Sequence, residues 1–369
     1  IGLFLETEEL TRTKTFLKIQ VMTKFSISKN LLMPAEWEKQ KSTWIAWPHN
    51  KKDWPNKFDH IPQVFAEIIY HISNSQMVNI LIQNNLLKKK ATLILKNFKV
   101  NFSNIKFTVC KTDRVWLRDS FPIFVRYNKR KKILINWDFN SWAKYKNFKQ
   151  DNNIISKIKK ISKLQSISPK FKKKKVVLEG GAIDVNGKGA LLTTEECLLS
   201  RVQQRNPGLK KQDYEKLFYD YFGIKKVLWL KKGIVGDDTH GHIDDLARFV
   251  SEKTIFLACE RNKKDMNYKI LRDNFKIIKK LDDFKKFKFI KIPMPKAKYI
   301  EGTRVPATYL NFYIANKIVL VPTFKDRNDK LVLEIFKKHF KNRKIIPIDC
   351  SILIWGFGAI HCMTQQEPK

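Results

Sequence analysis

Residues 236–245 read Gly236-Asp237-Asp238-Thr239-His240-Gly241-His242-Ile243-Asp244-Asp245. Four carboxylates and two imidazoles fall within nine residues, between apolar runs at 227–230 and 246–250. Side chains alternate between the two faces of an extended strand, so a strand here would project one set to the same side: Asp238, His240, His242 and Asp244. A solvated surface turn is the alternative. The density of titratable groups favours a site that handles protons, a metal ion or a cationic substrate.

Outward from this stretch, apolar runs alternate with helical periods. Helices are predicted at 60–73, 211–221, 267–284 and 331–340, and strands at 77–82, 105–110, 123–125, 176–178, 227–230, 254–258, 309–314, 318–321 and 344–348. Gly223 is a predicted helix C-cap, and Asn186-Gly187 predicts a hairpin turn. The lysine-rich segment 147–175 is expected to be an exposed, partly helical excursion. This rhythm predicts an α/β fold.

Three more segments place a reactive or charged side chain at a predicted strand edge or in a tight loop. Asp119 ends an acidic cluster at 113–119, and Glu179 precedes two glycines that allow close backbone approach. The segment 355–362 places glycines around bulky residues directly before Cys362, which predicts a tight loop that presents the thiol. The other four cysteines lie in or beside apolar runs and are expected to be small buried hydrophobes.

Charge and composition narrow the class of protein. The chain has 369 residues, 43% of them hydrophobic, and a formal net charge of +38. This size allows one large α/β domain or two ordinary ones. The lysines are scattered through every segment and no nucleic-acid motif accompanies them, so a basic nucleic-acid-binding protein is only the alternative from a different class.

The cysteines, the apolar runs and the N-terminal residues predict the cellular location and the domain boundaries. Five widely spaced cysteines are typical of a reduced, cytoplasmic protein. We expect no membrane association, because no run reaches the roughly 18 to 20 apolar residues of a membrane span. Residues 1–30 are weakly patterned and are expected to form a weakly ordered extension, whereas residues 31–369 are expected to form a single domain.

The chemistry suggested by these groups is attack of a thiolate on a cation. Cys362 can act as nucleophile and His242 as proton donor and later as base. Most cysteine hydrolases gain nothing from several acids beside the electrophile. A guanidinium, by contrast, is planar, permanently charged and offers five N–H donors, which carboxylates such as Asp119, Glu179 and Asp244 can hold. Holding it would also place its central carbon against the sulfur.

A zinc hydrolase is the competing enzyme class. The candidate ligands would be His240, His242, His361 and Cys362, with one open position for water. The spacing permits such a site. It leaves the carboxylates at 119, 179 and 244 without a role, which favours the guanidinium interpretation.

Six segments in consistent order resemble one known family. They are Met33-Pro34-Ala35-Glu36-Trp37, Trp47-Pro48-His49-Asn50, Trp116-Leu117-Arg118-Asp119, Glu179-Gly180-Gly181, the stretch from Gly236 to Asp244, and Ile360-His361-Cys362-Met363-Thr364-Gln365-Gln366. They resemble the agmatine deiminase and bacterial peptidylarginine deiminase family of the pentein superfamily. The resemblance implies a pseudo-fivefold α/β propeller of ββαβ-type repeats around a central channel, which the sequence periodicity does not reveal.

The resemblance also implies residue roles. Cys362 would form a covalent thiouronium intermediate, and His242 would protonate the departing ammonia and then activate water. Asp119 and Asp244 would hold the guanidinium, Glu179 would support the histidine or the substrate, and Trp116 would wall the pocket. No metal and no cofactor are implied. Asp237, Asp238 and Trp37 are candidates for holding the distal amine of the substrate.

Within the family, agmatine deiminase is the closer likeness, with N-carbamoylputrescine and ammonia as products in putrescine and polyamine biosynthesis. Peptidylarginine or free arginine is the alternative substrate. The expected partner is thus a small cationic guanidine and not nucleic acid, and a homo-oligomer is compatible with the sequence. Three residues depart from the family pattern and bear on loop geometry: Phe121, Lys317 and Phe357.

Overall fold

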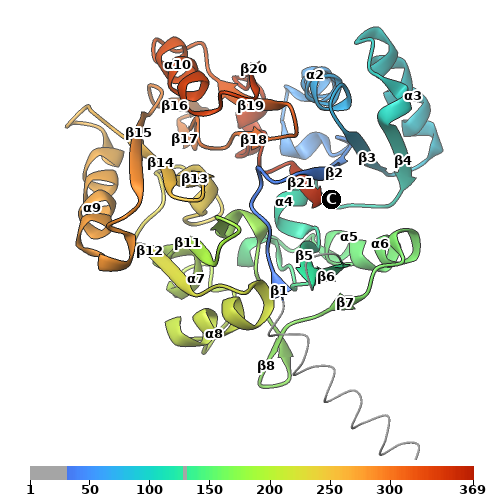
Figure 1. The fold of residues 1–369 in the computed structure, drawn as a ribbon. Coiled ribbons are helices and arrows are strands. Elements are labelled where there is room, and N and C mark those ends of the chain that lie inside the picture. The colour runs from blue at the N-terminus through green and yellow to red at the C-terminus, as the bar shows by residue number, and fades with distance from the viewer. Residues whose placement is uncertain (1–30, 128–130) are drawn as a thin grey trace, which may run out of the picture.

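Short buried strands and amphipathic helices build a mixed α/β fold (Figure 1). The structure is a computed structural model that describes residues 31–127 and 131–369. The predicted extension at 1–30 lies outside the described residues. In Figure 1 the long helices lie on the outer rim and the strands lie nearer the middle.

Five sheets in the described residues repeat one pairing pattern, an antiparallel pair followed by a parallel partner. Two of these sheets have four strands, which lie in the order β21 (Thr364–Pro368), β2 (Gln40–Ala46), β3 (Met77–Ile82) and β4 (Ile105–Val109) in one sheet and β1 (Leu31–Leu32), β5 (Ile123–Tyr127), β6 (Lys131–Ile135) and β7 (Ser166–Ile167) in the other. The other three sheets have three strands each. Their orders are β10 (Asp184–Val185), β11 (Ala190–Thr194) and β12 (Lys226–Leu230); β13 (Ala247–Ser251), β14 (Thr254–Cys259) and β15 (Lys288–Pro293); and β18 (Tyr313–Ile314), β19 (Ile318–Thr323) and β20 (Lys344–Asp349). Two small ladders pair β8 (Lys170–Phe171) with β9 (Lys174–Lys175) and β16 (Lys298–Ile300) with β17 (Thr303–Val305).

Each parallel pair is joined by a crossover, because parallel neighbours cannot be connected by a tight turn. The helices that make these crossovers are α2 (Ile61–Ser73), α3 (Asn85–Asn97), α5 (Lys149–Asn152), α6 (Ile154–Ser162), α7 (Glu195–Leu199), α8 (Lys211–Phe222), α9 (Met266–Lys280) and α10 (Asp329–His339). Their buried faces carry the predicted apolar stripes, for example Tyr214, Leu217 and Phe218 on α8. The short helix α4 (Leu117–Ser120) is not a crossover and lies in the site described below.

Short 3-10 helices form most of the remaining regular structure. They lie at Lys51–Asp53, Phe58–His60, Phe102–Asn104, Ser141–Ala143, Gly180–Ala182, Ile243–Asp245, Asp282–Phe284 and Leu353–Gly356. Two local predictions are confirmed, since Asn186 and Gly187 turn between β10 and β11 and Gly223 closes α8 with a φ of 68°.

Two strand predictions are wrong in extent. Residues 176–178 form only an isolated bridge between Val177 and Asp138, because this run is buried beside several elements without a ladder partner along its length. The predicted strand at 309–314 is limited to Tyr313 and Ile314. There Thr308 and Asn311 use their side chains to bond other segments, and the backbone turns instead of pairing.

Candidate active site

Residues 236–245 form a loop of turns that ends in the 3-10 helix Ile243–Asp245, so the predicted extended strand is wrong. Positive φ values at Gly236 (94°), His240 (63°) and Gly241 (96°) break the alternation of side chains. Asp237 holds the loop in place because its carboxylate accepts bonds from the backbone N–H groups of Thr239, Gly241 and His242 at 2.8 to 2.9 Å. These hydrogen bonds from the backbone to one carboxylate stabilise the turn.

This loop separates the four side chains that were predicted to share a face. Asp238 pairs with Lys144 and accepts a hydrogen bond from the Tyr145 hydroxyl at 2.7 Å. The His240 ring lies 3.1 Å from the Ser200 hydroxyl. Only His242 and Asp244 turn towards the other predicted catalytic groups.

His242 lies among three carboxylates that come from separate segments. Its Nδ1 is 3.8 Å from Asp119 Oδ1 and 3.9 Å from Asp244 Oδ1, and its Nε2 is 4.0 Å from Glu179 Oε2. Asp119 comes from α4, and Glu179 directly precedes the 3-10 helix Gly180–Ala182. The structure therefore brings together four of the five predicted catalytic side chains, with three carboxylates around one imidazole.

Close approach of Gly181 makes this grouping possible. A Cβ at Gly181 would lie 2.6 Å from His242 Nδ1 and 2.7 Å from Asp119 Oδ1, which is too close for any side chain. The Gly181 N–H donates to Asp119 Oδ1 at 3.0 Å, and Trp142 Nε1–H donates to Asp119 Oδ2 at 2.9 Å. The paired glycines that follow Glu179 thus serve backbone approach, as the sequence predicts.

The fifth predicted group, Cys362, meets the same cluster from the C-terminal segment. Its Sγ lies 3.9 Å from Asp244 Oδ2, and Asn311 Nδ2 donates to the sulfur at 3.0 Å. The Cys362 carbonyl accepts from the Arg118 N–H at 3.0 Å, which ties the cysteine to α4. Thiol, imidazole and three carboxylates therefore lie in one cluster.

The loop before Cys362 is shaped by aromatic rings. A Cβ at Gly358 would lie 2.8 Å from the Trp116 ring, which itself packs 5.5 Å from the Trp54 ring. Phe357 adopts a left-handed φ of 62°, so this departure from the family pattern occupies a strained position. Phe121 has an ordinary φ of −83°, and Lys317 is not among the described residues with positive φ.

Burial and mutual repulsion raise the pKa of the acids. Burial, reinforced by the Glu179 carboxylate, raises the pKa of Asp119 to about 7. Burial and a neighbouring aspartate raise the pKa values of Asp244 and Asp245 well above the usual range. Burial lowers the pKa of His242 far below its usual value and raises that of the Cys362 thiol. These shifts favour a neutral imidazole beside a neutral thiol. Among the described residues Arg205 pairs with Glu179, whereas no lysine or arginine pairs with Asp119 or Asp244.

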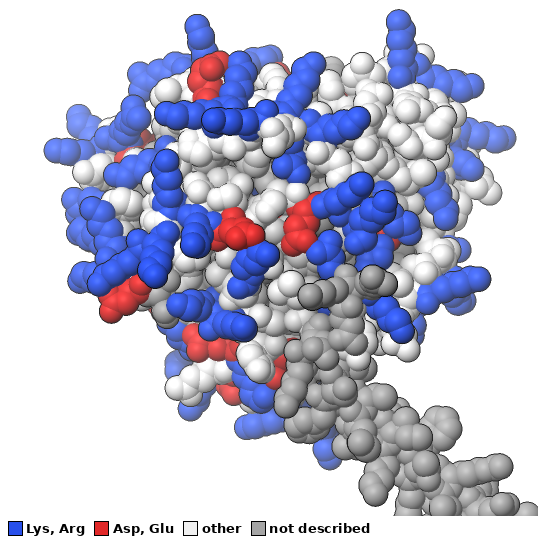
Figure 2. Space-filling model, viewed as in Figure 1, with Lys and Arg blue, Asp and Glu red and all other residues white. Residues whose placement is uncertain are grey.

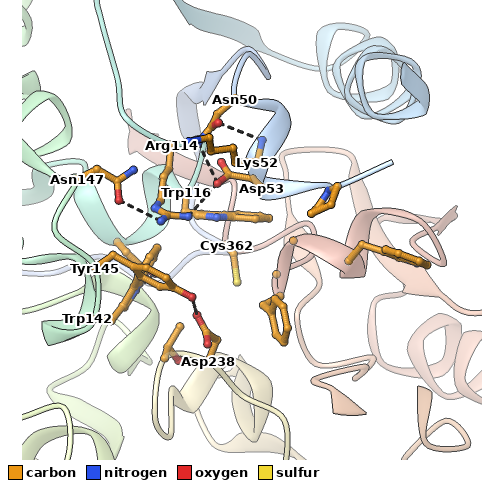
Figure 3. A pocket seen from close by; sticks show the side chains of 17 residues that line it. Asn50, Lys52, Asp53, Arg114, Trp116, Trp142, Tyr145, Asn147, Asp238 and Cys362 are labelled. Atoms are coloured by element: carbon orange, nitrogen blue, oxygen red, sulfur yellow. Dashed lines mark hydrogen bonds and ion pairs between the residues drawn. The ribbon is translucent and has the colours of Figure 1, made fainter. Parts of the chain in front are cut away.

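A cavity of about 530 Å³ reaches this cluster (Figure 3). Cys362, Asp119 and Trp116 line it, whereas His242, Asp244 and Glu179 do not. Figure 3 shows the Cys362 sulfur near the middle of the lining side chains, between Trp116 and the Tyr145–Asp238 pair. Further from the sulfur, Arg114 pairs with Asp53 at 2.8 Å and stacks on the Tyr145 ring at 4.3 Å.

A second layer of charged groups, which sequence reasoning missed, supports Asp244. His361 Nδ1 lies 2.7 Å from Asp244 Oδ2 and its Nε2 lies 2.8 Å from Glu36 Oε2. Glu36 also pairs with Arg118 at 3.3 Å and with Arg248 at 3.1 Å. These cations lower the pKa of Glu36. In the sequence, Glu36 stands out only as part of the first motif, and His361 only as a candidate zinc ligand beside the cysteine.

Asn311 and Arg205 were also missed. Asn311 Oδ1 accepts the His361 and Cys362 N–H groups at 2.9 and 3.2 Å, and its Nδ2 bonds Asp245 as well as the sulfur. Arg205 pairs with Glu179 at 2.9 Å with both side chains fully buried. Asn311 stands in an apolar segment and Arg205 in a turn-rich one, and nothing in either segment indicates these roles.

Of the three residues predicted to hold the distal amine, only Asp238 lines the cavity. Trp37 and Asp237 do not line the cavity, and the Trp37 carbonyl accepts a bond from Arg343. The four candidate zinc ligands do not converge, since His240 faces Ser200 and both His361 nitrogens meet carboxylates. Asp238 does line the cavity, with its charge paired to Lys144.

Residues 32–368 match the family of Porphyromonas-type peptidyl-arginine deiminases. The chain belongs to this family. A relative from Legionella pneumophila (strain Paris), named "Putative agmatine deiminase", is 32% identical over 342 residues, which span 91% of this chain and 95% of the relative.

Two solved structures of family members are similar throughout. A C. jejuni agmatine deiminase with substrate bound has a TM-score of 0.81 at 30% identity and covers 92% of this chain and 96% of its own. The Enterococcus faecalis agmatine deiminase has a TM-score of 0.83 at 29% identity, covering 94% and 97%. These likenesses confirm the mixed α/β fold of the family. Within the part of the chain that the structure describes, no helix has both the length and the apolar character needed to cross a bilayer.

Proposed function

We propose that this protein is an agmatine deiminase, which hydrolyses the guanidinium of agmatine to N-carbamoylputrescine and ammonia. The observation that carries the proposal is the Cys362 thiol on the wall of a cavity, beside the buried carboxyls of Asp119 and Asp244, neither of which pairs with a lysine or arginine among the described residues. The names of the similar proteins support the same substrate.

Binding of the guanidinium is supported by unused hydrogen-bond acceptors. Asp244 Oδ1 and Glu179 Oε2 are buried and have no hydrogen-bond partner among the described residues. Such orphaned acceptors are unfavourable unless a ligand supplies donors. A guanidinium supplies five N–H donors and the positive charge that would return Asp119 and Asp244 to their ionised forms. Trp116 would pack against the apolar part of the substrate.

The first half of the reaction forms a covalent intermediate. A bound cation beside Cys362 favours the thiolate, and the thiol proton passes to His242. The sulfur attacks the central guanidinium carbon, and the C–N bond to one terminal nitrogen then breaks. His242 gives its proton to that nitrogen, which leaves as ammonia, and a thiouronium remains on Cys362.

The second half uses water. His242, now neutral, removes a proton from a water molecule that attacks the same carbon. The C–S bond breaks, the hydroxyl proton of the tetrahedral intermediate passes to the sulfur, His242 releases its proton to solvent, and N-carbamoylputrescine leaves. Asn311 and His361 act as positioning residues here, because Asn311 bonds the sulfur and His361 holds Asp244.

Peptidylarginine or free arginine is the second candidate substrate, since the matching family is described by peptidyl-arginine. Both differ from agmatine only beyond the guanidinium, where the cavity is lined by Asp53, Arg114, Tyr145 and Asp238. Asp53 Oδ2 has no hydrogen-bond partner in the described residues, and it could accept the distal amine of agmatine.

A substrate panel tests the proposal. Purified protein is incubated separately with agmatine, arginine and a peptidylarginine, and ammonia and ureido product are measured. Agmatine should react fastest, and Cys362→Ala should abolish turnover with an unchanged thermal midpoint. Turnover that survives in this variant would exclude the cysteine mechanism, and preference for arginine or the peptide would exclude the proposed substrate.

We also propose the propeller arrangement, the cellular location, the pathway and the partners that are expected for a member of this family. The repeated sheet pattern supports a pentein-type pseudo-fivefold propeller of ββαβ units in a single domain spanning 31–369. Five free cysteines support a cytoplasmic location, and the product supports a place in putrescine biosynthesis. Light scattering would test for a homo-oligomer, and nuclease-treated preparations should carry no nucleic acid.

A further inference from the structure

One cluster of potential metal ligands in the described residues combines a catalytic group with a thiol that the reaction does not use. Glu179, Cys197 and His242 each offer one ligand atom, and these atoms lie within 4.8 Å of one another. All three residues are buried. Cys197 comes from α7, where its N–H donates to the Thr194 hydroxyl.

Two of the three ligand atoms are unpartnered. Glu179 Oε2 and His242 Nε2 lie 4.0 Å apart and neither has a hydrogen-bond partner within residues 31–127 and 131–369. The Glu179 side chain is 0% exposed and that of His242 is 1% exposed. Buried polar atoms are almost always satisfied, so in protein without bound substrate these two facing atoms are available to an ion placed between them.

The donor set fits one class of ion. Thiolate, imidazole and carboxylate together are typical of zinc and of other thiophilic divalent cations. Tetrahedral zinc bonds of about 2.0 to 2.3 Å require ligand atoms about 3.3 to 3.6 Å apart. The ligand atoms in this cluster lie within 4.8 Å of one another, so their separations exceed this range by at most about 1.5 Å, which small side-chain movements can close.

We propose that Glu179, Cys197 and His242 form an inhibitory site for a thiophilic divalent cation such as Zn²⁺. Binding would transfer the Cys197 thiol proton to solvent and leave a fourth position for water. Because the ion would occupy His242 Nε2, the imidazole could no longer exchange protons in the reaction. The inhibitory consequence rests on the proposed function, whereas the binding itself does not.

The local charges support a cation despite one opposing group. Arg205 lies 2.9 Å from Glu179 Oε1 and repels a metal ion. Burial raises the pKa of the Cys197 thiol, and the nearby carboxylates of Glu179, Asp237 and Asp119 raise it further. The same carboxylates attract a cation to this position. With the thiolate added, the site has an excess of negative charge.

Metal binding is tested without catalysis in a Cys362→Ala background, which removes the catalytic thiol as a competing ligand. Titration with Co²⁺ should produce a near-ultraviolet thiolate-to-cobalt band in Cys362→Ala. The band should disappear in Cys362→Ala/Cys197→Ala and persist in Cys362→Ala/Cys350→Ala, whose thiol is equally buried but remote from these ligands. Zn²⁺ should raise the thermal midpoint of the first and third proteins only. A missing band in Cys362→Ala, or a band that survives loss of Cys197, would overturn the site.

Inhibition is tested with the catalytic cysteine intact. Zn²⁺ should inhibit the wild-type protein, and Cys197→Ala should keep basal turnover while the inhibitory concentration rises by at least about tenfold. Cys350→Ala should show wild-type sensitivity. Equal sensitivity in Cys197→Ala would place the inhibitory zinc on Cys362 and overturn the proposal. If the substrate panel fails, the cobalt titration still decides whether the site exists.

Discussion

The protonation state of Asp119 is coupled to binding of the cationic substrate. Its carboxyl is buried, bonded by Trp142 and Gly181, and near Glu179, and its pKa is raised to about 7. A group with this pKa changes charge in the range where the protein works. A cationic ligand binds the ionised form, so binding and deprotonation are coupled.

Agmatine affinity should therefore rise with pH. Below pH 7 Asp119 is largely protonated and neutral, and above it the carboxylate can hold the guanidinium. In Cys362→Ala, which cannot turn the substrate over, calorimetric affinity should increase between pH 6 and 8 and protons should be released to the buffer. Affinity that is flat or falls over this range would contradict the role of Asp119.

Asn311 controls the sulfur directly. Asn311→Asp keeps the acceptor oxygen for the N–H groups of His361 and Cys362 but replaces the donor to Sγ with a negative charge. We expect alkylation of Cys362 by iodoacetamide at fixed pH to slow by at least about tenfold, because a nearby anion disfavours the thiolate.

Asn316→Asp is the matched control for this variant. Asn316 also makes amide hydrogen bonds that are partly buried, but to the backbone of Gln40 and far from the sulfur. In Asn316→Asp, Cys362 should be alkylated at the same rate as in the wild-type protein. Similar slowing in both variants would show that the effect comes from general loosening of the protein.

At the scale of elements, the site is built from ends and turns. One or two side chains each come from α4, from the residues at or just before the 3-10 helices Gly180–Ala182 and Ile243–Asp245, and from the loop before β21. Their relative placement depends on close approach at two glycines, since a Cβ at Gly180 would lie 2.3 Å from the Arg118 carbonyl oxygen and one at Gly181 would lie 2.6 Å from His242 Nδ1. Small changes in these turns therefore move catalytic groups without altering any of them.

Gly181→Ala should inactivate the protein through position alone. The new methyl would displace His242 or Asp119, and displacement of about 1 Å can lower turnover by about 10²-fold. Gly302→Ala is the control, because nothing lies within 4 Å of a Cβ there and only its φ of 79° is unfavourable. It should lower stability by about 1 kcal/mol and leave turnover unchanged. Equal activity of the two variants would contradict the steric argument.

Most elements could be predicted from the sequence because their signals are local. The period of α8, the turn at Asn186-Gly187 and the apolar run of β3 each depend on neighbouring residues. The loop at 236–245 was predicted wrongly as a strand, because its geometry depends on positive φ values and on the Asp237 carboxylate.

The site was predicted only in part for a similar reason. Charged and nucleophilic residues in dense motifs, such as His242 and Cys362, are visible in the sequence. Glu36, Asn311 and Arg205 act through contacts with residues far along the chain, and no local pattern reveals such contacts.

At the scale of the whole molecule, positive charge surrounds an acidic site. Figure 2 shows lysine and arginine side chains spread over the visible face, in keeping with the net charge of +38. This distribution repels a dicationic substrate at long range, while the buried acids attract it at short range.

Added salt should therefore increase kcat/KM for agmatine. Screening shortens the range of the repulsion, since the Debye length falls from about 30 Å at 0.01 M salt to about 8 Å at 0.15 M. Initial rates at low substrate, measured in sodium chloride over this range, should rise severalfold, with kcat nearly constant. A fall in kcat/KM would show that the surface field assists the substrate.

The pairing of β2 with β21 ties the two ends of the described chain together, with Ser42 bonded to Glu367 across 325 positions. During vectorial synthesis on the ribosome, the edge of β2 that β21 later covers must wait for almost the entire chain to emerge. Exposed strand edges invite pairing with other chains, so nascent molecules depend on prompt completion or on chaperones. Since Cys362 lies directly before the closing strand, a prematurely terminated product is both open at this edge and devoid of its nucleophile.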